Sequence, residues 1–195
     1  YYLLKDVSFG NDGNISQEKL ESCINSDLAN NYGNLCQRVL AFCEKNCGSK
    51  IPTCDFINDD LEILKNFENL AYLRDLIDNQ NINDYMKFII DMLFSSNKYF
   101  NDQEPWKKKN DKNRLNTIVY TALDLIRKIS ILLNPVIPNT TSKVLKIFDI
   151  KDDKLKFEDV NNHKFLESGK NIGKLNILFK KIENDWFTLS LRSRA

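Results

Sequence analysis

The stretch RLNTIVYTALDLIRKISILL, residues 114–133, determines the fold class of this chain. Its apolar residues recur every three or four positions, which is the spacing of one face of an α-helix. A long amphipathic helix of this kind buries its apolar side against other helices. The segment NPVIPN, which follows directly, ends the helix because proline lacks an amide donor and disfavours helix in the residue before it. The stripe consists of Leu115, Ile118, Val119, Ala122, Leu123, Ile126, Ile129 and Leu132.

The same period recurs along most of the chain, and residues 83–100 carry it most clearly. We predict an all-α fold: a helical bundle over residues 16–150, a linking segment before it (1–15), and a less regular C-terminal tail (151–195) that packs back on the bundle. The other predicted helices are a short one capped by Ser16 and ending near residue 24, one that restarts at residue 25 or 26 and runs to residue 46, and the ranges 59–77 and 140–148.

Composition excludes several classes of protein. The chain has 195 residues, of which 42% are hydrophobic and 28% charged, as in soluble globular proteins. No apolar run is long enough to span a membrane, and the N-terminus does not resemble a secretory signal, so we expect a cytoplasmic protein. The abrupt apolar start without methionine suggests a piece of a longer protein. Because the net charge is only +1, any nucleic-acid site must come from local clustering of charge.

The five cysteines are expected to be reduced, because their number is odd and no signal peptide precedes them. Cys36, Cys43 and Cys47 lie beside Leu40 on the apolar flank of one predicted helix, which indicates packing. A cysteine-based zinc module is the alternative, but CxxC pairs and a nearby histidine are missing. The sequence therefore predicts no metal site, and the one histidine, His163, is read as a solvated loop residue.

The chain has few residues and motifs from which a catalytic centre could be built. The chain has one histidine and lacks a glycine-rich phosphate loop, an HExxH motif and a GxSxG motif. Its acid pairs, Asp59 with Asp60 and Asp152 with Asp153, are interpreted as helix starts and solvated faces. We predict no catalytic residue in this chain.

Two stretches favour a binding role. In EPWKKK, Trp106 lies at a polar helix junction, where it either closes the end of the bundle or stacks on an unpaired base. Basic side chains that could attract phosphates surround it: Lys107, Lys108, Lys109, Lys112 and Arg114.

In NNYGNLCQRVLAF, residues 30–42, Asn34 and Arg38 are one helical turn apart on the flank opposite the cysteines. No acid is near enough in sequence to pair with Arg38. Together the two side chains could read the edge of a splayed base. Alternatively, Asn34 bonds within its helix and Arg38 extends over the edge of the core.

Four stretches in this order resemble the C-terminal part of bacterial methionyl-tRNA synthetases: YYLLKDVSFGNDGNIS, INSDLANNYGNLCQRVL, SSNKYFNDQEPWK and LLNPVIPNTTSKVLKIF. In that family this region is the helical-bundle anticodon-binding domain of a class I synthetase. The resemblance implies that Asn34, Arg38 and Trp106 hold the CAU anticodon of a methionine tRNA, and that Pro105 shapes the turn. We expect the three side chains to share one solvent-open cleft at one end of the bundle. Arg38 would lack an acid because its partner is RNA.

The family's two nucleotide-binding motifs, of the HIGH and KMSKS types, are absent from the chain. The resemblance therefore implies that methionine, ATP and the zinc of an insertion in the catalytic half bind upstream of Tyr1. The complete enzyme would attach methionine to its tRNA using ATP, whereas this chain would hold no cofactor and be inactive alone. No DNA or membrane partner is expected. Two alternatives stay open: the corresponding domain of another class I synthetase, and a helical scaffold or protein-interaction domain.

Overall fold

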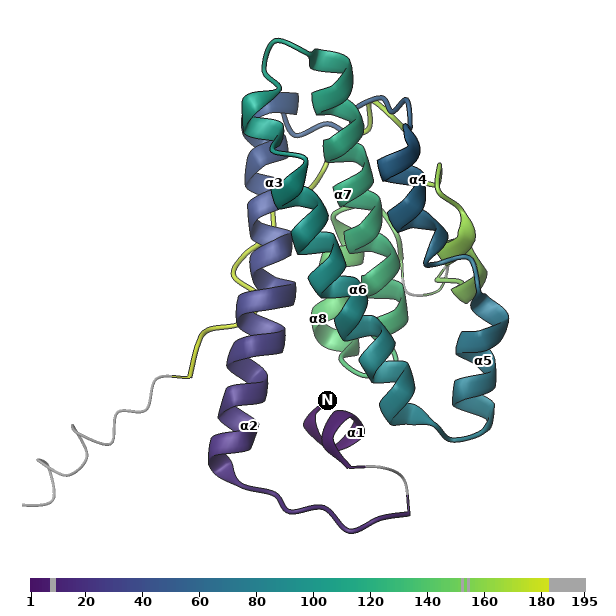
Figure 1. The fold of residues 1–195 in the computed structure, drawn as a ribbon. Helices are drawn as coiled ribbons and strands as arrows, with labels where there is room; N and C mark the ends of the chain where they lie inside the picture. Colours follow the sequence, from purple (N-terminus) through teal and green to yellow (C-terminus); the bar gives the residue numbers. More distant parts are fainter. Residues whose placement is uncertain (8–9, 152, 154, 183–195) are drawn as a thin grey trace, which may run out of the picture.

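The computed structural model describes residues 1–7, 10–151, 153 and 155–182 (Figure 1). Within these ranges the chain is built from helices and loops, and the only strand-like pairing is an isolated bridge between Lys50 and Asn171. The all-α prediction is confirmed. The predictions for Asp152 and for the part of the tail beyond Ile182 lie outside the described residues.

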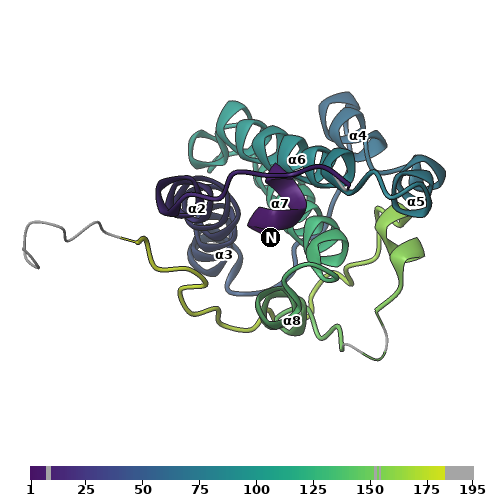
Figure 2. The same cartoon turned by 90° about the horizontal axis from the view of Figure 1, so that it is seen from below.

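Helix α7, Lys112–Leu133, is the centre of the bundle. Every residue from Thr117 to Leu133 is buried, because α7 packs against α3 (Asn34–Cys47), α6 (Ile82–Asp102) and α8 (Pro138–Lys146) (Figure 2). A helix that is covered on all sides must also bury its polar residues. The predicted helices 83–100 and 114–133 are confirmed, and the predicted 140–148 helix is present as α8, shifted by two residues.

The prediction of two separate helices before residue 47 is wrong. Helix α2 (Gln17–Cys23), the π-helical segment η1 (Ile24–Gly33) and α3 form one continuous helical rod (Figure 1). As predicted, Ser16 caps its start, with Oγ accepting from the Lys19 amide at 3.2 Å. Gly48 ends the rod in the left-handed conformation, with φ of 62°, which glycine adopts without strain.

Tertiary contacts explain why η1 does not break the rod. Asp27 of η1 is buried and accepts from the Lys5 ammonium at 2.5 Å and from the Tyr1 hydroxyl at 3.1 Å. Lys5 belongs to the short N-terminal helix α1, Tyr2–Asp6, which lies on α6 and was not predicted, and Tyr1 is the residue just before that helix. Asn83 of α6 donates to the Lys5 carbonyl at 2.9 Å and holds α1 in place.

The prediction of one helix over residues 59–77 is also wrong. Helix α4, Asn58–Lys65, and helix α5, Leu70–Asp78, are separated by a turn. The side chain of Asn69 caps α5 by accepting from the Tyr72 amide at 3.1 Å. Phe67 is fully buried in the turn and anchors it in the core. An asparagine that satisfies a free amide of the first turn favours a new helix start over continuation.

As far as residue 182, in the part that the structure describes, the segment after α8 runs over the bundle without forming an α-helix. The 3₁₀ segment η4 (Phe157–Asn161) lies against α7. Further on, the Ile51 amide donates to the Lys170 carbonyl at 2.9 Å, and the Gly169 amide donates to the Ile51 carbonyl at 2.7 Å. These hydrogen bonds join the segment to the loop between α3 and α4.

Candidate nucleic-acid interface

Arg38 of α3 and Trp106 both contact the ring of Phe100, on α6. The Arg38 guanidinium carbon lies 5.8 Å from the centre of the Phe100 ring. The Trp106 ring meets the same phenyl ring edge-on, with 6.3 Å between centroids and 73° between planes. Because Phe100 is buried, with 2% of its surface exposed, it is a fixed support for both side chains. The sequence predicted Arg38 and Trp106 as site residues but read Phe100 only as part of an apolar stripe.

A tight turn presents Trp106 to solvent. Helix α6 ends at Asp102, and Glu104 takes a left-handed conformation with φ of 44°. Pro105 is buried and opens the 3₁₀ turn η2, Pro105–Lys107, in which the Lys107 amide donates to the Glu104 carbonyl at 2.8 Å. Since proline fixes φ near the value that this turn needs, the backbone carrying the indole is held in place. Trp106 keeps 40% of its surface exposed.

Arg38 is held by a neutral partner. Its Nη2 donates to Oδ1 of Asn101 at 2.5 Å, and no carboxylate among the described residues pairs with it. No neighbouring carboxylate therefore offsets the positive charge of the guanidinium, which can attract an anionic ligand. Asn34 lies one turn earlier, half-buried, and its side chain makes no hydrogen bond to a described residue. Arg38 and Trp106 contact the same phenyl ring. That these two side chains and Asn34 share one cleft stays a prediction.

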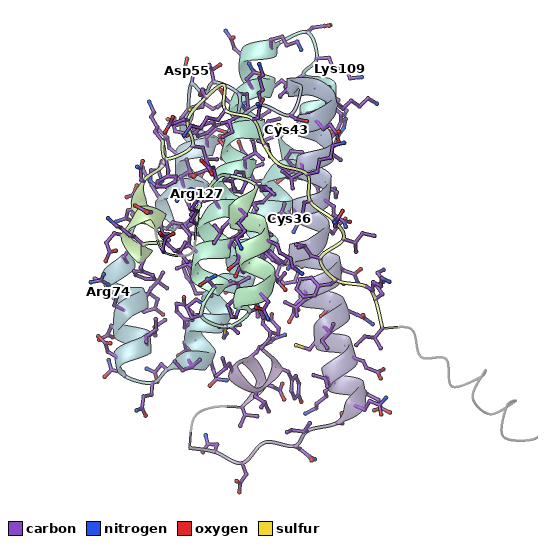
Figure 3. The ribbon with its side chains drawn as sticks, turned by 180° about the vertical axis from the view of Figure 1, so that it is seen from behind. Cys36, Cys43, Asp55, Arg74, Lys109 and Arg127 are labelled. Carbon is purple, nitrogen blue, oxygen red and sulfur yellow. The ribbon has the colours of Figure 1, made fainter. Side chains whose placement is uncertain are left out.

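The lysines after Trp106 form a basic edge at the end of the bundle farthest from α1. Lys108, Lys109 and Lys112 are exposed and make no ion pair with any described residue. Lys107 is exposed too, and its ammonium lies 2.8 Å from the Glu104 carboxylate. Figure 3 shows Lys109 at this end of the molecule. Exposed lysines can approach a phosphate without first giving up a strong partner.

Arg114 differs from these lysines. Its side chain is only 13% exposed, and two of its nitrogens donate to the carboxylate of Asp60, at 2.6 and 3.0 Å. It also donates to Gln103 Oε1 at 2.6 Å, and the Tyr99 hydroxyl donates to the same Asp60 carboxylate. This geometry argues against a phosphate contact by Arg114. Asp60 begins a helix, as predicted, but it is fully buried, so its interpretation as a solvated face is wrong.

The cysteines are free thiols. Cys36 and Cys43 are buried, as predicted, whereas Cys47 is only half-buried. Across the described part of the chain, no three His, Cys, Asp or Glu side chains gather closely enough to hold a metal ion. His163 is not a solvated residue: its side chain is 19% exposed, and Nε2 lies 3.0 Å from Glu68 Oε1. None of the described helices has the length and apolar character needed to cross a membrane.

Comparison with known families gives two matches. Residues 58–189 match the family described as the anticodon binding domain of methionyl tRNA ligase. Residues 1–40 match the family described as class I tRNA synthetases of the methionine type. The first match spans more than half of the chain and includes Trp106 and the lysines; the second includes Asn34 and Arg38.

Similar proteins carry the same description. The chain is 36% identical over 172 residues to a methionine–tRNA ligase of Rhizobium meliloti, covering 87% of this chain and 33% of that protein. It is 33% identical over 187 residues to the ligase of Thermotoga maritima, covering 94% of this chain and 30% of that protein. The apo crystal structure of Mycobacterium tuberculosis methionyl-tRNA synthetase superimposes with a TM-score of 0.88 at 30% identity, over 94% of this chain and 38% of that one. The chain thus spans about a third of the length of these relatives.

Proposed function

This chain belongs to the family of methionyl-tRNA ligase anticodon-binding domains, and on that premise we propose that it binds the CAU anticodon of a methionine tRNA through Asn34, Arg38 and Trp106. The observation that carries the proposal is the shared contact of Arg38 and Trp106 with Phe100. A charged group with hydrogen-bond donors and an aromatic group that can stack thus contact the same buried ring, which supports a shared site.

Trp106 supplies the stacking platform. A splayed base stacks on an aromatic ring whatever its identity, and such stacking contributes about 1–3 kcal/mol per base. The indole is exposed enough for this contact, and it is supported by Phe100 and by the proline turn. Because the turn is already formed, little conformational freedom is lost when RNA binds.

Asn34 and Arg38 recognise the edges of bases through hydrogen bonds. The amide of Asn34 offers both a donor and an acceptor, and the guanidinium of Arg38 offers a fork of donors that matches the acceptors of a base or a phosphate. In the free protein Arg38 bonds to the neutral Asn101, so binding RNA exchanges one hydrogen bond for another and breaks no ion pair.

The exposed lysines attract the phosphates of the RNA, whatever its base sequence. We assign phosphate contacts to Lys107, Lys108, Lys109 and Lys112, and we leave Arg114 out because Asp60 already holds it. The relatives are methionine–tRNA ligases, and a full-length protein of that kind, acting in the cytoplasm, would attach methionine to this tRNA using ATP. ATP, methionine and any zinc would bind outside this chain.

The test is a titration of the chain with two anticodon stem-loops that differ only in the wobble base, one with CAU and one altered. The proposal expects tighter binding of the CAU loop at every salt concentration. Equal affinity for the two loops contradicts base reading, and would favour a helical scaffold that attracts RNA only by charge.

A further inference from the structure

Helix α6 carries an exposed aromatic side chain near the candidate RNA site. Phe94 keeps 60% of its surface exposed. Asn101, whose Oδ1 accepts from Arg38, follows Phe94 by seven residues, which is about 20° short of two full helical turns. The side chains of Phe94 and Asn101 therefore project from the same face of α6, about 10 Å apart along its axis. The exposed ring thus continues the surface that carries Arg38.

The next turn of α6 presents a hydrogen-bond acceptor of fixed orientation. Asn97 follows Phe94 by three residues, so the two side chains are neighbours on the helix surface. Its Nδ2 donates to the Leu93 carbonyl at 3.2 Å and to Oδ1 of Asn31, on η1, at 2.6 Å. Because a backbone carbonyl can only accept, the amino group of Asn97 must face inward, which turns its Oδ1 outward. This Oδ1 reaches the surface and accepts no hydrogen bond from a described residue.

The asparagine behind Asn97 is incompletely bonded. Asn31 is 5% exposed, and its Nδ2 has no hydrogen-bond partner among the described residues. Buried donors are almost always paired, because an unpaired one costs free energy. The boundary between η1 and α6, which lie side by side in the bundle (Figure 1), therefore holds two amide atoms whose bonding the described chain leaves incomplete. One of them, Oδ1 of Asn97, is open to a ligand.

We propose that Phe94 and Asn97 form a second nucleotide subsite, which binds one further unpaired nucleotide of the RNA loop whose wobble base lies at Arg38 and Trp106. The ring of Phe94 stacks on the base, and Oδ1 of Asn97 accepts from its exocyclic amino group. Adenine, cytosine and guanine carry such a group and uracil does not. The inference rests on the proposed function, because it takes the same RNA loop as the ligand.

The spacing and the charges fit a splayed nucleotide. The separation of Phe94 from Asn101, about 10 Å, is much larger than the spacing of stacked bases, about 3.4 Å. Each of the two bases would therefore stack on the protein instead of on the other. Lys98, one turn after Phe94, is exposed and pairs with Asp102, and a surface ion pair of this kind is weak enough to exchange for a phosphate. Asp91, one turn before Phe94, is exposed and repels phosphate, so the subsite ends there.

The experiment measures the affinity of the chain for CAU stem-loops by fluorescence anisotropy. In a series of loops, each position except the wobble base is replaced in turn by an abasic nucleotide. Phe94→Ala should weaken binding of the intact loop about tenfold. At one position of the series the wild type should show a loss of the same size, and Phe94→Ala should show no further loss there. Trp106→Ala should remain sensitive to that position.

Control variants separate stacking from folding. Because Phe94 is exposed, Phe94→Ala should melt like the wild type when followed by circular dichroism. Phe94→Tyr keeps an aromatic face and should retain most of the affinity. Tyr72→Ala removes a ring that is 47% exposed from α5, on the side of the bundle away from α2 and α3 (Figure 2), and should leave binding unchanged.

A second pair of measurements tests Asn97. At the position that the abasic series identifies, the base is replaced by its counterpart without the amino group, such as purine for adenine. The wild type should lose affinity several-fold, and Asn97→Ala should bind both loops equally. An equal loss in the wild type and in Asn97→Ala overturns the role of Asn97.

Failure of the subsite is distinguishable from failure of the proposed function. If the wild type binds CAU and wobble-altered loops equally, base reading at Arg38 and Trp106 is refuted, and the abasic series still decides the subsite. If that discrimination is present but Phe94→Ala binds as tightly as the wild type, or keeps the wild-type sensitivity at every abasic position, the second subsite is overturned. A chain that binds no stem-loop overturns both.

Discussion

Arg114 and Asp60 form a two-pronged ion pair, with Nη1–Oδ2 and Nη2–Oδ1 distances of 2.6 and 3.0 Å, next to the turn that carries Trp106. Asp60 is fully buried and begins α4, whereas Arg114 belongs to the first turn of α7. Since Gln103 at the end of α6 accepts from the same guanidinium at 2.6 Å, one side chain joins three helices. These contacts give Arg114 a structural role: it stabilises the junction of α4, α6 and α7 next to the candidate site.

The first prediction concerns this pair. Arg114→Met should lower the free energy of unfolding by about 3–5 kcal/mol, because it leaves the Asp60 carboxylate buried without a cation. Lys112→Met, two residues earlier and exposed, should change it by less than about 0.5 kcal/mol. Urea titration of both variants measures the difference. Equal stabilities would show that Asp60 does not depend on Arg114.

A second prediction follows from the buried charges of α7. The side chains of Asp124, Arg127 and Lys128 are fully buried, and Figure 3 places Arg127 in the interior of the molecule. Arg127 donates to the carbonyls of Asp159 and Asn162 at 2.9 and 2.8 Å, and Lys128 donates to that of Val160. The segment after residue 150 thus supplies acceptors for two buried cations.

Truncation after residue 150 should therefore destabilise the bundle by several kcal/mol, since charged donors lose their partners at about 1.5–3 kcal/mol each. Truncation after residue 166 keeps all three carbonyls and is the matched control. Thermal melts followed by circular dichroism compare the two forms with the full chain. A bundle 1–150 as stable as 1–166 would show that water or Asp124 satisfies the cations without the segment.

The third prediction is a pH dependence. Burial lowers the pKa of Lys128 to about 8, although the neighbouring Asp124 carboxylate acts in the opposite direction. In the unfolded chain the same lysine keeps its proton up to about pH 10.4. Between these two values unfolding takes up a proton, so the contribution of Lys128 to the free energy of unfolding rises with pH, by at most on the order of 1 kcal/mol per pH unit. Below about pH 8 its contribution is constant.

The comparison of the wild type with Lys128→Met isolates this contribution. Buried tyrosines and cysteines have raised pKa values and lower the stability at alkaline pH, but they do so in both proteins. The difference in the free energy of unfolding, wild type minus variant, should therefore increase from pH 8 to pH 10. A difference that stays flat over this window would mean that Lys128 keeps its ordinary pKa in the folded state.

The spacing of hydrophobic residues predicted the helices whose apolar stripes face the core. It did not predict where helices continue or which side chains pair, because tertiary contacts decide these. The rod from α2 to α3 contains Asn25 and Ser26, which are typical of a helix start. The rod stays continuous there because the next residue, Asp27, is buried and bonds to Tyr1 and to Lys5 of α1. Arg114 reads as one more cation in a basic run, because its partner Asp60 lies 54 residues earlier. Phe100 has the same period as other core residues, and nothing local marks it as the support of two site residues.

The residues of the candidate site fall into two groups, those that the sequence alone marks and those that it does not. Arg38 and Trp106 could be selected because each is unusual in its setting: a cation on an apolar helix without an acid, and an indole after proline in a polar junction. Residues that only position them carry no such signal. Asn101, which accepts from Arg38, is an ordinary polar residue at the end of a helix.

The last prediction divides the binding energy among the proposed RNA contacts. Trp106→Ala should remove base stacking and Arg38→Met should remove edge hydrogen bonds, each costing about 1–3 kcal/mol against a CAU stem-loop. Trp106→Phe, which keeps an aromatic face, should lose less than Trp106→Ala. Each loss should shrink when the anticodon is already wrong, because a loop whose wobble base does not fit Asn34 and Arg38 would not dock fully and would not form all of these contacts in the first place.

Replacing Lys107, Lys108 and Lys109 by methionine should act differently. Phosphate contacts release counterions without reading sequence, so the triple variant should weaken cognate and altered loops equally and reduce the slope of log affinity against log salt by about 2. Titrations at several salt concentrations, with both loops, measure the two effects on the same proteins. If Trp106→Ala gives the same uniform loss as the lysine variant, the indole closes the end of the bundle and reads no base. If instead the lysine variant alone flattens the salt dependence and Trp106→Ala alone narrows the discrimination between loops, attraction by charge and docking of the matched loop on Trp106 are separate parts of one surface.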